Sequence, residues 1–327
     1  MTAGQAYGLA SFSIALICAG LMGYAIQRGA TCTVAAVDEI VRHRRATRLI
    51  AIVEASIWVI GGLILAACFG VLPMQPAGYA VTSWTIPGGM LLGYGAYVNR
   101  ACVFGSVARI GSGEWAFLMT PVGFLAGCWA IAVTGVTTKV RLDTQSLVLA
   151  MPHLLVLPLG LFALWRLWRA GSAWRRRAFA AHIWSPHLAT ALIGITFVIM
   201  LLTVGAWAYT DVLAQIAHGM ATMLGSRAML LLALLTGALV GGWTAGRLAW
   251  VVPTFAGLAR CFTGGALMGI GSSLIPGGND GLILIGLPLL HPFAWIAFLT
   301  MCITIAAAMI LPKVTASQGD ADAPSVS

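Results

Sequence analysis

The chain has 327 residues, of which 60% are hydrophobic and 8% are charged, and its formal net charge is +9. A mean hydropathy of +0.95 leaves too little polar surface to cover a soluble globule of this size, so the composition excludes a soluble protein. The positive charge does not indicate nucleic-acid binding, because the arginines flank apolar runs and no basic folded domain presents them.

The first apolar run lies at about 7–26, and we expect it to be a retained transmembrane helix. No basic segment precedes it and no small-residue cleavage site interrupts it, unlike a secretory signal. The run leads into Gln27-Arg28-Gly29-Ala30-Thr31-Cys32. A guanidinium near bilayer depth is costly unless it faces a protein-lined or wet cavity, so Arg28 and Cys32 are candidates for a polar pathway.

Two arginine-rich loops indicate the orientation of the chain. Residues 42–48 and 166–177 hold half of the chain's 18 lysine and arginine residues, and short basic loops stay on the cytoplasmic side. The amino terminus is then outside. Glu54 lies within the second apolar run, and we expect it to pair with an arginine rather than to carry protons.

A glycine-rich segment precedes the second cysteine motif. Pro87-Gly88-Gly89-Met90-Leu91-Leu92-Gly93-Tyr94-Gly95 runs into Asn99-Arg100-Ala101-Cys102-Val103-Phe104-Gly105. Glycine and arginine beside a cysteine are poor choices for ordinary helix packing, so Arg100 and Cys102 join the candidate pathway. Further on, Glu114 opens a helix and is expected to pair with Arg109.

Further apolar runs are long enough, or nearly so, to cross a hydrocarbon core of ~30 Å. They lie at about 49–72, 114–135, 146–165, 187–209, 228–246 and 281–311. Other segments are too short or too rich in glycine to cross as one smooth helix. We therefore expect an all-α integral membrane protein with about eight to nine transmembrane helices plus short re-entrant or broken helices.

The third cysteine motif, Gly257-Leu258-Ala259-Arg260-Cys261-Phe262, adds Arg260 and Cys261 to the candidate pathway residues. It continues through Gly264 and Gly265, and farther on Asn279-Asp280 follow Pro276-Gly277-Gly278. Asn279 and Asp280 either hold a turn that shapes the passage or cap the following helix, and the two roles are compatible.

The glycine pattern occurs twice. Gly-Gly-x-x-x-Gly-x-Gly at 88–95 matches 264–271 at every glycine. Paired glycine-interrupted segments in two halves are typical of transporters that bind substrate between repeats, although small-residue faces for helix packing also explain them. We expect one membrane transport domain at 1–312, with related halves at roughly 1–135 and 187–312, and a disordered tail at 313–327. The relative orientation of the halves stays open.

The seven cysteines form no disulfide framework, because their number is odd, their spacing is wide and no Cys-x-x-Cys occurs. Four of them lie in smooth apolar runs and are expected to be small core residues: Cys18, Cys68, Cys128 and Cys302. The six histidines have no metal-ligand spacing, and no phosphate-binding loop or hydrolase motif occurs. We expect no metal, no cofactor and no catalytic residue.

The motifs around Cys102 and Cys261, including the continuation to Asp280, strongly resemble the cysteine segments of the YeeE/YedE family of sulfur transporters. The segment before Cys32 resembles the family's first cysteine site more loosely. The resemblance covers about 10–310 and is weakest in the arginine-rich middle loop.

The resemblance implies a multi-pass permease of the bacterial inner membrane that takes up thiosulfate. It implies an all-helical fold in which short helices dip from both faces toward a central constriction. Three cysteines, here Cys32, Cys102 and Cys261, would hand the ion inward without covalent chemistry. Family members are often linked to a small cytoplasmic sulfur-carrier protein of the TusA type.

Charge compensation and shape would come from residues beside the cysteines and in the glycine-rich turns: Arg28, Arg100, Arg260, Gly88, Gly89, Gly264, Gly265 and Asn279. Neutral thiols suit the task, because a thiolate repels an anion and invites oxidation. Two alternatives remain, namely transport of another sulfur or selenium species, and a membrane thiol-dependent sulfur transferase that uses one cysteine as a nucleophile.

Overall fold

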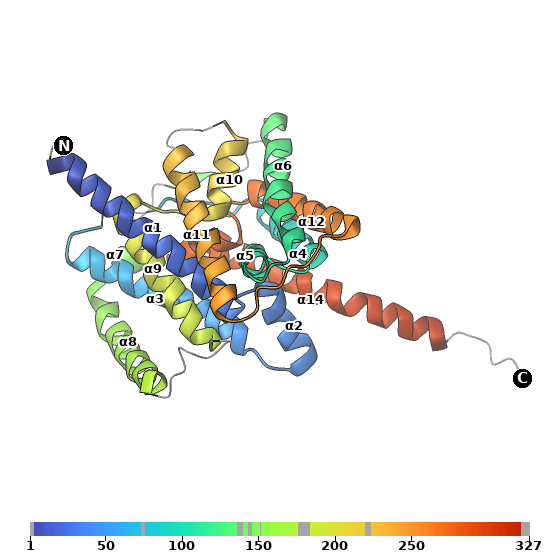
Figure 1. The fold of residues 1–327 in the computed structure, drawn as a ribbon, viewed down its shortest axis with the longest axis horizontal. Coiled ribbons are helices and arrows are strands. Elements are labelled where there is room, and N and C mark those ends of the chain that lie inside the picture. The colour runs from blue at the N-terminus through green and yellow to red at the C-terminus, as the bar shows by residue number, and fades with distance from the viewer. Residues whose placement is uncertain are drawn as a thin grey trace, which may run out of the picture.

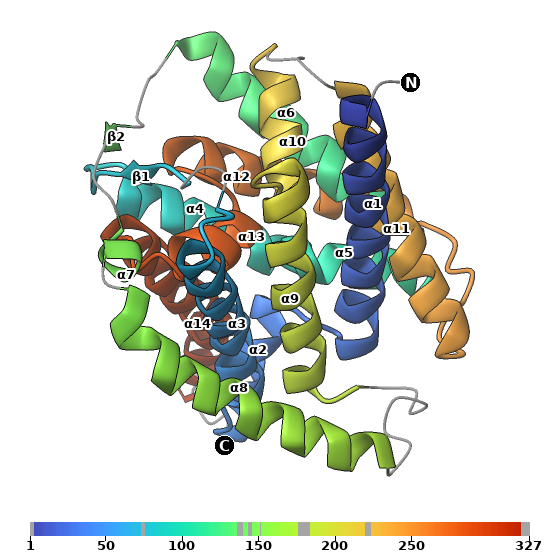
Figure 2. The same ribbon diagram turned by 90° about the vertical axis from the view of Figure 1, so that its left-hand side faces the viewer.

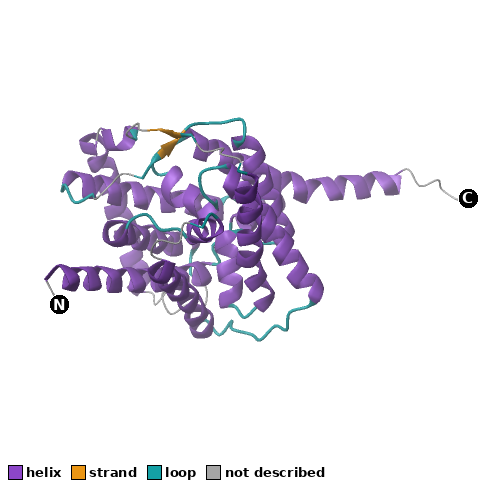
Figure 3. Ribbon diagram, turned by 90° about the horizontal axis from the view of Figure 1, so that it is seen from above, coloured by secondary structure: helices purple, strands orange, loops and turns teal. Residues whose placement is uncertain are grey.

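The computed structural model describes residues 3–72, 76–135, 140–142, 146–150, 152–175, 184–219 and 224–321. Most of these residues are helical (Figure 3), and the two short strands β1 (Gly78–Tyr79) and β2 (Arg141–Leu142) pair antiparallel. The expected all-α fold is confirmed.

The amino-terminal helices are α1 (Ala3–Gly29), α2 (Thr33–His43), α3 (Thr47–Cys68), α4 (Thr85–Asn99), α5 (Val103–Gly111), the 3-10 turn η1 (Trp115–Leu118) and α6 (Met119–Thr134). The short α7 (Leu147–Ala150) and α8 (Pro152–Arg175) follow. The carboxyl-terminal helices are α9 (Pro186–Val204), α10 (Tyr209–Ala217), α11 (Leu224–Thr244), α12 (Phe255–Leu274), α13 (Asn279–Gly281), the π-helical η3 (Leu282–Gly286) and α14 (Pro292–Ala321).

Six segments of the described chain are long and apolar enough to cross a membrane, or seven if the bent pair of α12 with α13 and η3 forms one span. Eight or nine were expected. The difference arises partly at 146–165, where the structure has α7 and then α8, whose apolar part, Leu154–Arg166, is shorter than a full span. Short helices such as α2, α5 and α10 carry much of the remaining apolar sequence.

Helices far apart in the sequence pack in matching pairs. The packing of α1 on α11 is repeated by α9 on α3, that of α4 on α14 by α12 on α6, and that of α2 on α14 by α10 on α6. The corresponding helices α1 and α9 contact each other, as do α4 and α12 (Figure 1, Figure 2). The helices from α1 to α6 therefore have counterparts in the same order from α9 to α14.

The repeated glycines lie where these helices touch. A Cβ on Gly88 would come within 2.7 Å of Ile275 Cγ2, and one on Gly264 within 2.6 Å of Asn99 Cβ. Gly89 meets the carbonyl of Ala297 on α14 in the same way, and Gly265 meets Thr120 on α6. These four glycines permit close helix packing, and through it they set the positions of the helix ends that follow.

Glu54 on α3 is buried in an ionic cluster. Arg166 Nε of α8 donates to its Oε1 at 2.6 Å, and His187 Nδ1 of α9 lies 2.6 Å from its Oε2. The expected pairing of Glu54 with an arginine is confirmed. The carboxylate thereby fastens α8 to the α3–α9 pair.

The carboxyl-terminal helix continues beyond the apolar run. α14 extends to Ala321 and projects from the body of the molecule (Figure 1). Helix is thus present over 313–321 of the expected disordered tail, and 322–327 lie outside the described residues.

Candidate substrate pathway

Two helix breaks present cysteines in the same backbone geometry. After α1, Ala30 is left-handed (φ 47°) and Cys32 is the extended residue that precedes α2. After α4, Arg100 is left-handed (φ 62°) and Cys102 precedes α5 in the same way. Both breaks close with the same hydrogen bonds, since the amides of Thr31 and Ala101 each donate to the carbonyl five residues back at 3.1 Å. This is the Schellman pattern of helix ends.

The two breaks bring their thiols together. The Cys32 and Cys102 side chains are within hydrogen-bonding reach of each other. The amide of Thr33, in the first turn of α2, donates to Cys102 Sγ at 3.1 Å. On the other side, a Cβ added to Gly105 in α5 would overlap Cys32 Sγ. Each thiol therefore lies against the amino-terminal turn of the other cysteine's helix.

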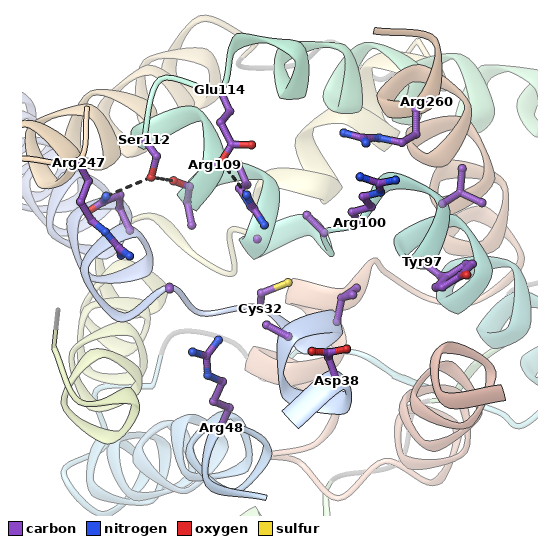
Figure 4. A pocket seen from close by; sticks show the side chains of 18 of the residues that line it. Cys32, Asp38, Arg48, Tyr97, Arg100, Arg109, Ser112, Glu114, Arg247 and Arg260 are labelled. Carbon is purple, nitrogen blue, oxygen red and sulfur yellow. Dashed lines mark hydrogen bonds and ion pairs between the residues drawn. The ribbon is translucent and has the colours of Figure 1, made fainter. Parts of the chain in front are cut away.

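Cys32 also faces a cavity of about 1190 Å³ (Figure 4). The cavity lies beside the residues of the α2–α3 connection, where Arg42 and Arg48 line it. Cys32 is 8% exposed, whereas Cys102 is fully buried behind it. An ion in the cavity would thus reach Cys32 first and Cys102 next.

Positive charge dominates the cavity wall. Its arginines come from five different parts of the chain: Arg42, Arg48, Arg100, Arg109, Arg247 and Arg260. Two carboxylates face them, and each is already paired, Asp38 with Arg42 at 2.5 Å and Glu114 with Arg109 at 2.7 Å.

The other four arginines have no ion-pair partner among the described residues: Arg48, Arg100, Arg247 and Arg260. Arg100 and Arg260 approach each other from the α4–α5 break and from α12 (Figure 4). Like charges this close repel unless an anion lies between or near them. The cavity is therefore suited to a small multivalent anion.

Cys261 occupies a different setting from the other two candidate cysteines. It lies within α12, fully buried, and its side chain contacts those of Arg260 and Thr120. Thr120 donates to Asn99 Oδ1 at 3.0 Å, and Asn99 Nδ2 donates to Ser106 Oγ at 3.0 Å. Cys261 is thus placed behind Arg260 and connected by a polar chain to the first turn of α5, without touching the thiol pair.

Two more helix breaks meet the cysteine breaks from the other half of the chain. Ala208 precedes α10 and Gly278 precedes α13, and each follows its counterpart, Cys32 or Cys102, by 176 residues (208 − 32 and 278 − 102). At these two breaks the interacting side chains are the carboxylate of Asp280 and the hydroxyl of Thr210. Asp280 accepts from the amide of Thr210 at 3.2 Å and from its hydroxyl.

Asn279 joins the two pairs of breaks. Its Nδ2 donates to Thr33 Oγ1 at 3.3 Å, while its buried Oδ1 has no hydrogen-bond partner among the described residues. Asn279 and Asp280 are both in the first turn of α13, directly after the break at Gly278. Each therefore lies at a helix amino terminus and also where the helix breaks of the two halves meet. A buried amide oxygen without a hydrogen-bond donor indicates that the Asn279 side chain can reorient or that it accepts a hydrogen bond from a ligand.

Arg28 lies away from the cavity. Its guanidinium is over the Tyr24 ring at 5.5 Å and the Trp184 ring at 5.8 Å, and its carbonyl accepts from the Trp184 amide at 3.0 Å. The four repeated glycines do not line the cavity either. Of the expected charge-compensating residues, Arg100 and Arg260 are at the cavity, whereas Arg28 anchors α1 to the start of α9.

Sequence reasoning missed the pairing of Cys32 with Cys102, because it looked for paired thiols close together in the chain. It also missed Arg48 and Arg247 as cavity residues. A signal was present for the first, since both cysteines follow a glycine-containing apolar helix and precede a short amphipathic one. Nothing local marks Arg48 or Arg247.

The comparisons with known proteins agree with the membrane architecture. A family model described as sulphur transport matches residues 28–307. No curated protein matches the chain.

Proposed function

The chain belongs to the sulphur transport family, also called YeeE/YedE, and from this premise we propose that it is a permease that takes up thiosulfate or a closely related sulfur anion. The proposed route leads through the membrane past Cys32, Cys102 and Cys261. Membership in the family supports a multi-pass membrane transporter of sulfur compounds rather than an enzyme.

The observation that carries the proposal is the thiol pair beside an arginine-lined cavity, with Cys32 in the cavity wall and Cys102 directly behind it. Four arginines that have no carboxylate partner in the described part of the chain provide the positive potential that a dianion requires. The amino-terminal turns of α2 and α5 meet at the thiols, and helix amino termini favour negative charge. A neutral thiol is a weak donor and a soft acceptor, so it can touch a terminal sulfur without retaining it.

The proposed transfer is a series of loose contacts. The ion's terminal sulfur is passed between Cys102 and Cys32, and its oxyanion end then reaches Arg100 and Arg260, beside which Cys261 is placed. Successive weak sites allow an ion to leave as readily as it enters, whereas a strong site would hold it. Asn279, with its unsatisfied amide oxygen beside Thr33, contributes to the shape of the passage from the second half.

The wider setting is proposed on the same basis. We propose that the protein resides in a bacterial inner membrane with the arginine-lined cavity on the cytoplasmic side, and the basic loop at 42–48, which contributes Arg42 and Arg48 to the cavity, supports this orientation. The transport domain covers 1–312 and combines two related halves. A small TusA-like sulfur carrier receives the ion at the cavity, whose positive wall suits an anionic cargo. Another sulfur or selenium anion of similar size and charge remains the alternative substrate.

A membrane sulfur transferase is the second candidate, and the contact between Cys32 and Cys102 favours it, because vicinal thiols are a common redox arrangement. A transferase would form a covalent persulfide or thiosulfonate on one cysteine during each turnover. Mass spectrometry of protein trapped during uptake distinguishes the two, since a permease shows unmodified thiols.

The test of the permease is labelled thiosulfate uptake by cells that depend on thiosulfate for sulfur. Replacing Cys32, Cys102 or Cys261 singly by alanine should reduce uptake by at least about tenfold at one or more positions, equivalent to ~1.4 kcal/mol in the barrier. The matched controls, Cys18→Ala, Cys68→Ala and Cys302→Ala, should retain uptake. Full uptake by all three pathway variants, at equal protein level, contradicts the proposal.

A further inference from the structure

We propose that Cys32 and Cys102 form a reversible disulfide when the protein meets hydrogen peroxide, and that this disulfide closes the passage. The two thiols are 70 residues apart in sequence and free in the structure. The chemistry of the disulfide does not depend on the transported ion, whereas its effect on uptake rests on the proposed function.

Proximity is the first requirement, and the structure meets it. Cys102 Sγ is 3.1 Å from the amide nitrogen of Thr33, which is bonded to the carbonyl carbon of Cys32. Adding the two intervening bonds places Cys102 Sγ at most about 6 Å from Cys32 Cα. The side chains are also within hydrogen-bonding reach of each other, so a disulfide would join two neighbouring thiols.

Access is the second requirement, and it differs between the thiols. Cys32 lines the cavity and is 8% exposed, whereas Cys102 is fully buried behind it. An oxidant that enters the cavity therefore meets Cys32 first. This is the arrangement of an accessible sensor cysteine with an adjacent resolving cysteine.

The cavity wall admits a neutral oxidant. Its uncompensated arginines repel metal cations, while they leave neutral peroxide free to enter. The same walls, together with the amino-terminal turns of α2 and α5, stabilise the small fraction of thiolate that reacts. Hydrogen peroxide, a small neutral oxidant, can therefore reach the Cys32 thiol.

The chemistry balances in two steps. The Cys32 sulfur attacks one peroxide oxygen, the O–O bond breaks, and Cys32 sulfenic acid and one water form. The Cys102 sulfur then attacks the sulfenic sulfur, its proton leaves with the hydroxyl group as a second water, and the S–S bond forms. Peroxide gains two electrons and the two thiols lose two. A cytoplasmic dithiol reverses the change by thiol–disulfide exchange.

Closure follows from the loss of both S–H groups. A disulfide has no proton to donate to the substrate's terminal sulfur, and the S–S bond fixes α2 against α5 where Cys32 lines the cavity. Uptake should then stop until the disulfide is reduced. The protein would thus stop importing the sulfur compound while the two cysteines in its passage are oxidised.

The experiment treats the full-length protein in native membranes with hydrogen peroxide, removes the oxidant, blocks free thiols with an alkylating reagent and maps the peptides by mass spectrometry. We expect a Cys32–Cys102 linked peptide in the wild type, a fall in labelled uptake of about fivefold or more, and recovery of both after dithiothreitol. Cys102→Ser should instead accumulate sulfenic or sulfinic acid on Cys32. Cys32→Ser should leave Cys102 as a free thiol.

The matched control is Cys68→Ala, which removes an exposed cysteine and should change neither the linked peptide nor its effect on uptake. Absence of the linked peptide while Cys32 is oxidised overturns the inference. A linked peptide with unchanged uptake overturns the closure while leaving the disulfide. A linked peptide in a protein that never transports thiosulfate contradicts the proposed function instead, so the two failures are distinguishable.

Discussion

The two helix breaks that contain a cysteine differ in their polar side chains from the two corresponding breaks that contain none. At α1–α2 and α4–α5, the residue before the second helix is Cys32 or Cys102, and the thiols adjoin an arginine-lined cavity. At α9–α10 and α12–α13, the corresponding residues are Ala208 and Gly278, and a buried carboxylate lies just beyond them. Thiols are on one side and a carboxyl group is on the other.

The difference indicates a division of labour between two related frameworks. Asp280 is held by two groups of Thr210 and is 1% exposed, so its role is to fasten α10 to α13. Cys32 lines the cavity and Cys102 lies directly behind it, so the thiol pair is available to a substrate. We infer that one pair of breaks provides the contacts and the other pair provides the rigid support behind them.

The largest expected effect comes from moving a thiol between the two frameworks. Cys32→Ala should lower thiosulfate uptake by at least about tenfold, and adding Ala208→Cys should not restore it, because Ala208 is 2% exposed and does not line the cavity. Labelled uptake at equal protein level measures both. Recovery in the double variant would show that the two frameworks are interchangeable.

Asp280→Ala should lower the stability of the folded protein, whereas the affinity for thiosulfate should change little. It leaves the Thr210 amide and hydroxyl without their acceptor in a buried site, which costs about 1–3 kcal/mol per unsatisfied group. The melting temperature of the detergent-solubilised protein should fall clearly. Asp280→Asn retains an acceptor and is the milder control. An unchanged melting temperature together with lost uptake would instead assign Asp280 to the passage.

Much of this comparison was predictable from sequence, and the missing part was long-range. The apolar runs gave the membrane class, and the glycine repeat at Gly88 and Gly264 was visible as a pattern. The contact between Cys32 and Cys102 was not, because it depends on how α2 and α5 meet across 70 residues. Arg28 was expected beside the pathway, but Tyr24 and Trp184 hold it elsewhere. Local spacing cannot distinguish these placements.

Cavity arginines should affect apparent affinity more than maximal rate. Arg100→Gln or Arg260→Gln removes one uncompensated charge from the wall, and we expect the KM for thiosulfate to rise about three- to tenfold, equivalent to ~0.6–1.4 kcal/mol. Increasing salt should reduce the difference from wild type, because exposed charges are screened.

Arg28→Gln is the matched control for the cavity arginines. It removes the same charge from outside the cavity, so it should leave KM within about twofold while it lowers stability through lost contacts with two aromatic rings. Equal effects of Arg28 and Arg100 on KM would contradict the division between cavity and anchor.

The smallest expected effect concerns His291, which opens α14 at the position that corresponds to Trp115 before α6 (291 − 176). Burial lowers the pKa of His291, and its Nε2 has no hydrogen-bond partner among the described residues. The unfolded chain therefore binds the proton more readily than the folded one. The resulting contribution to stability is complete above the unfolded pKa of about 6.5 and decreases as pH falls through that value. Between pH 7.5 and 5.5 the wild type should lose slightly more thermal stability than His291→Gln, which cannot titrate. An equal loss of thermal stability in the wild type and in His291→Gln would assign the acid sensitivity to other titratable groups. His291 and Trp115 would then not differ in their effect on the pH dependence of stability.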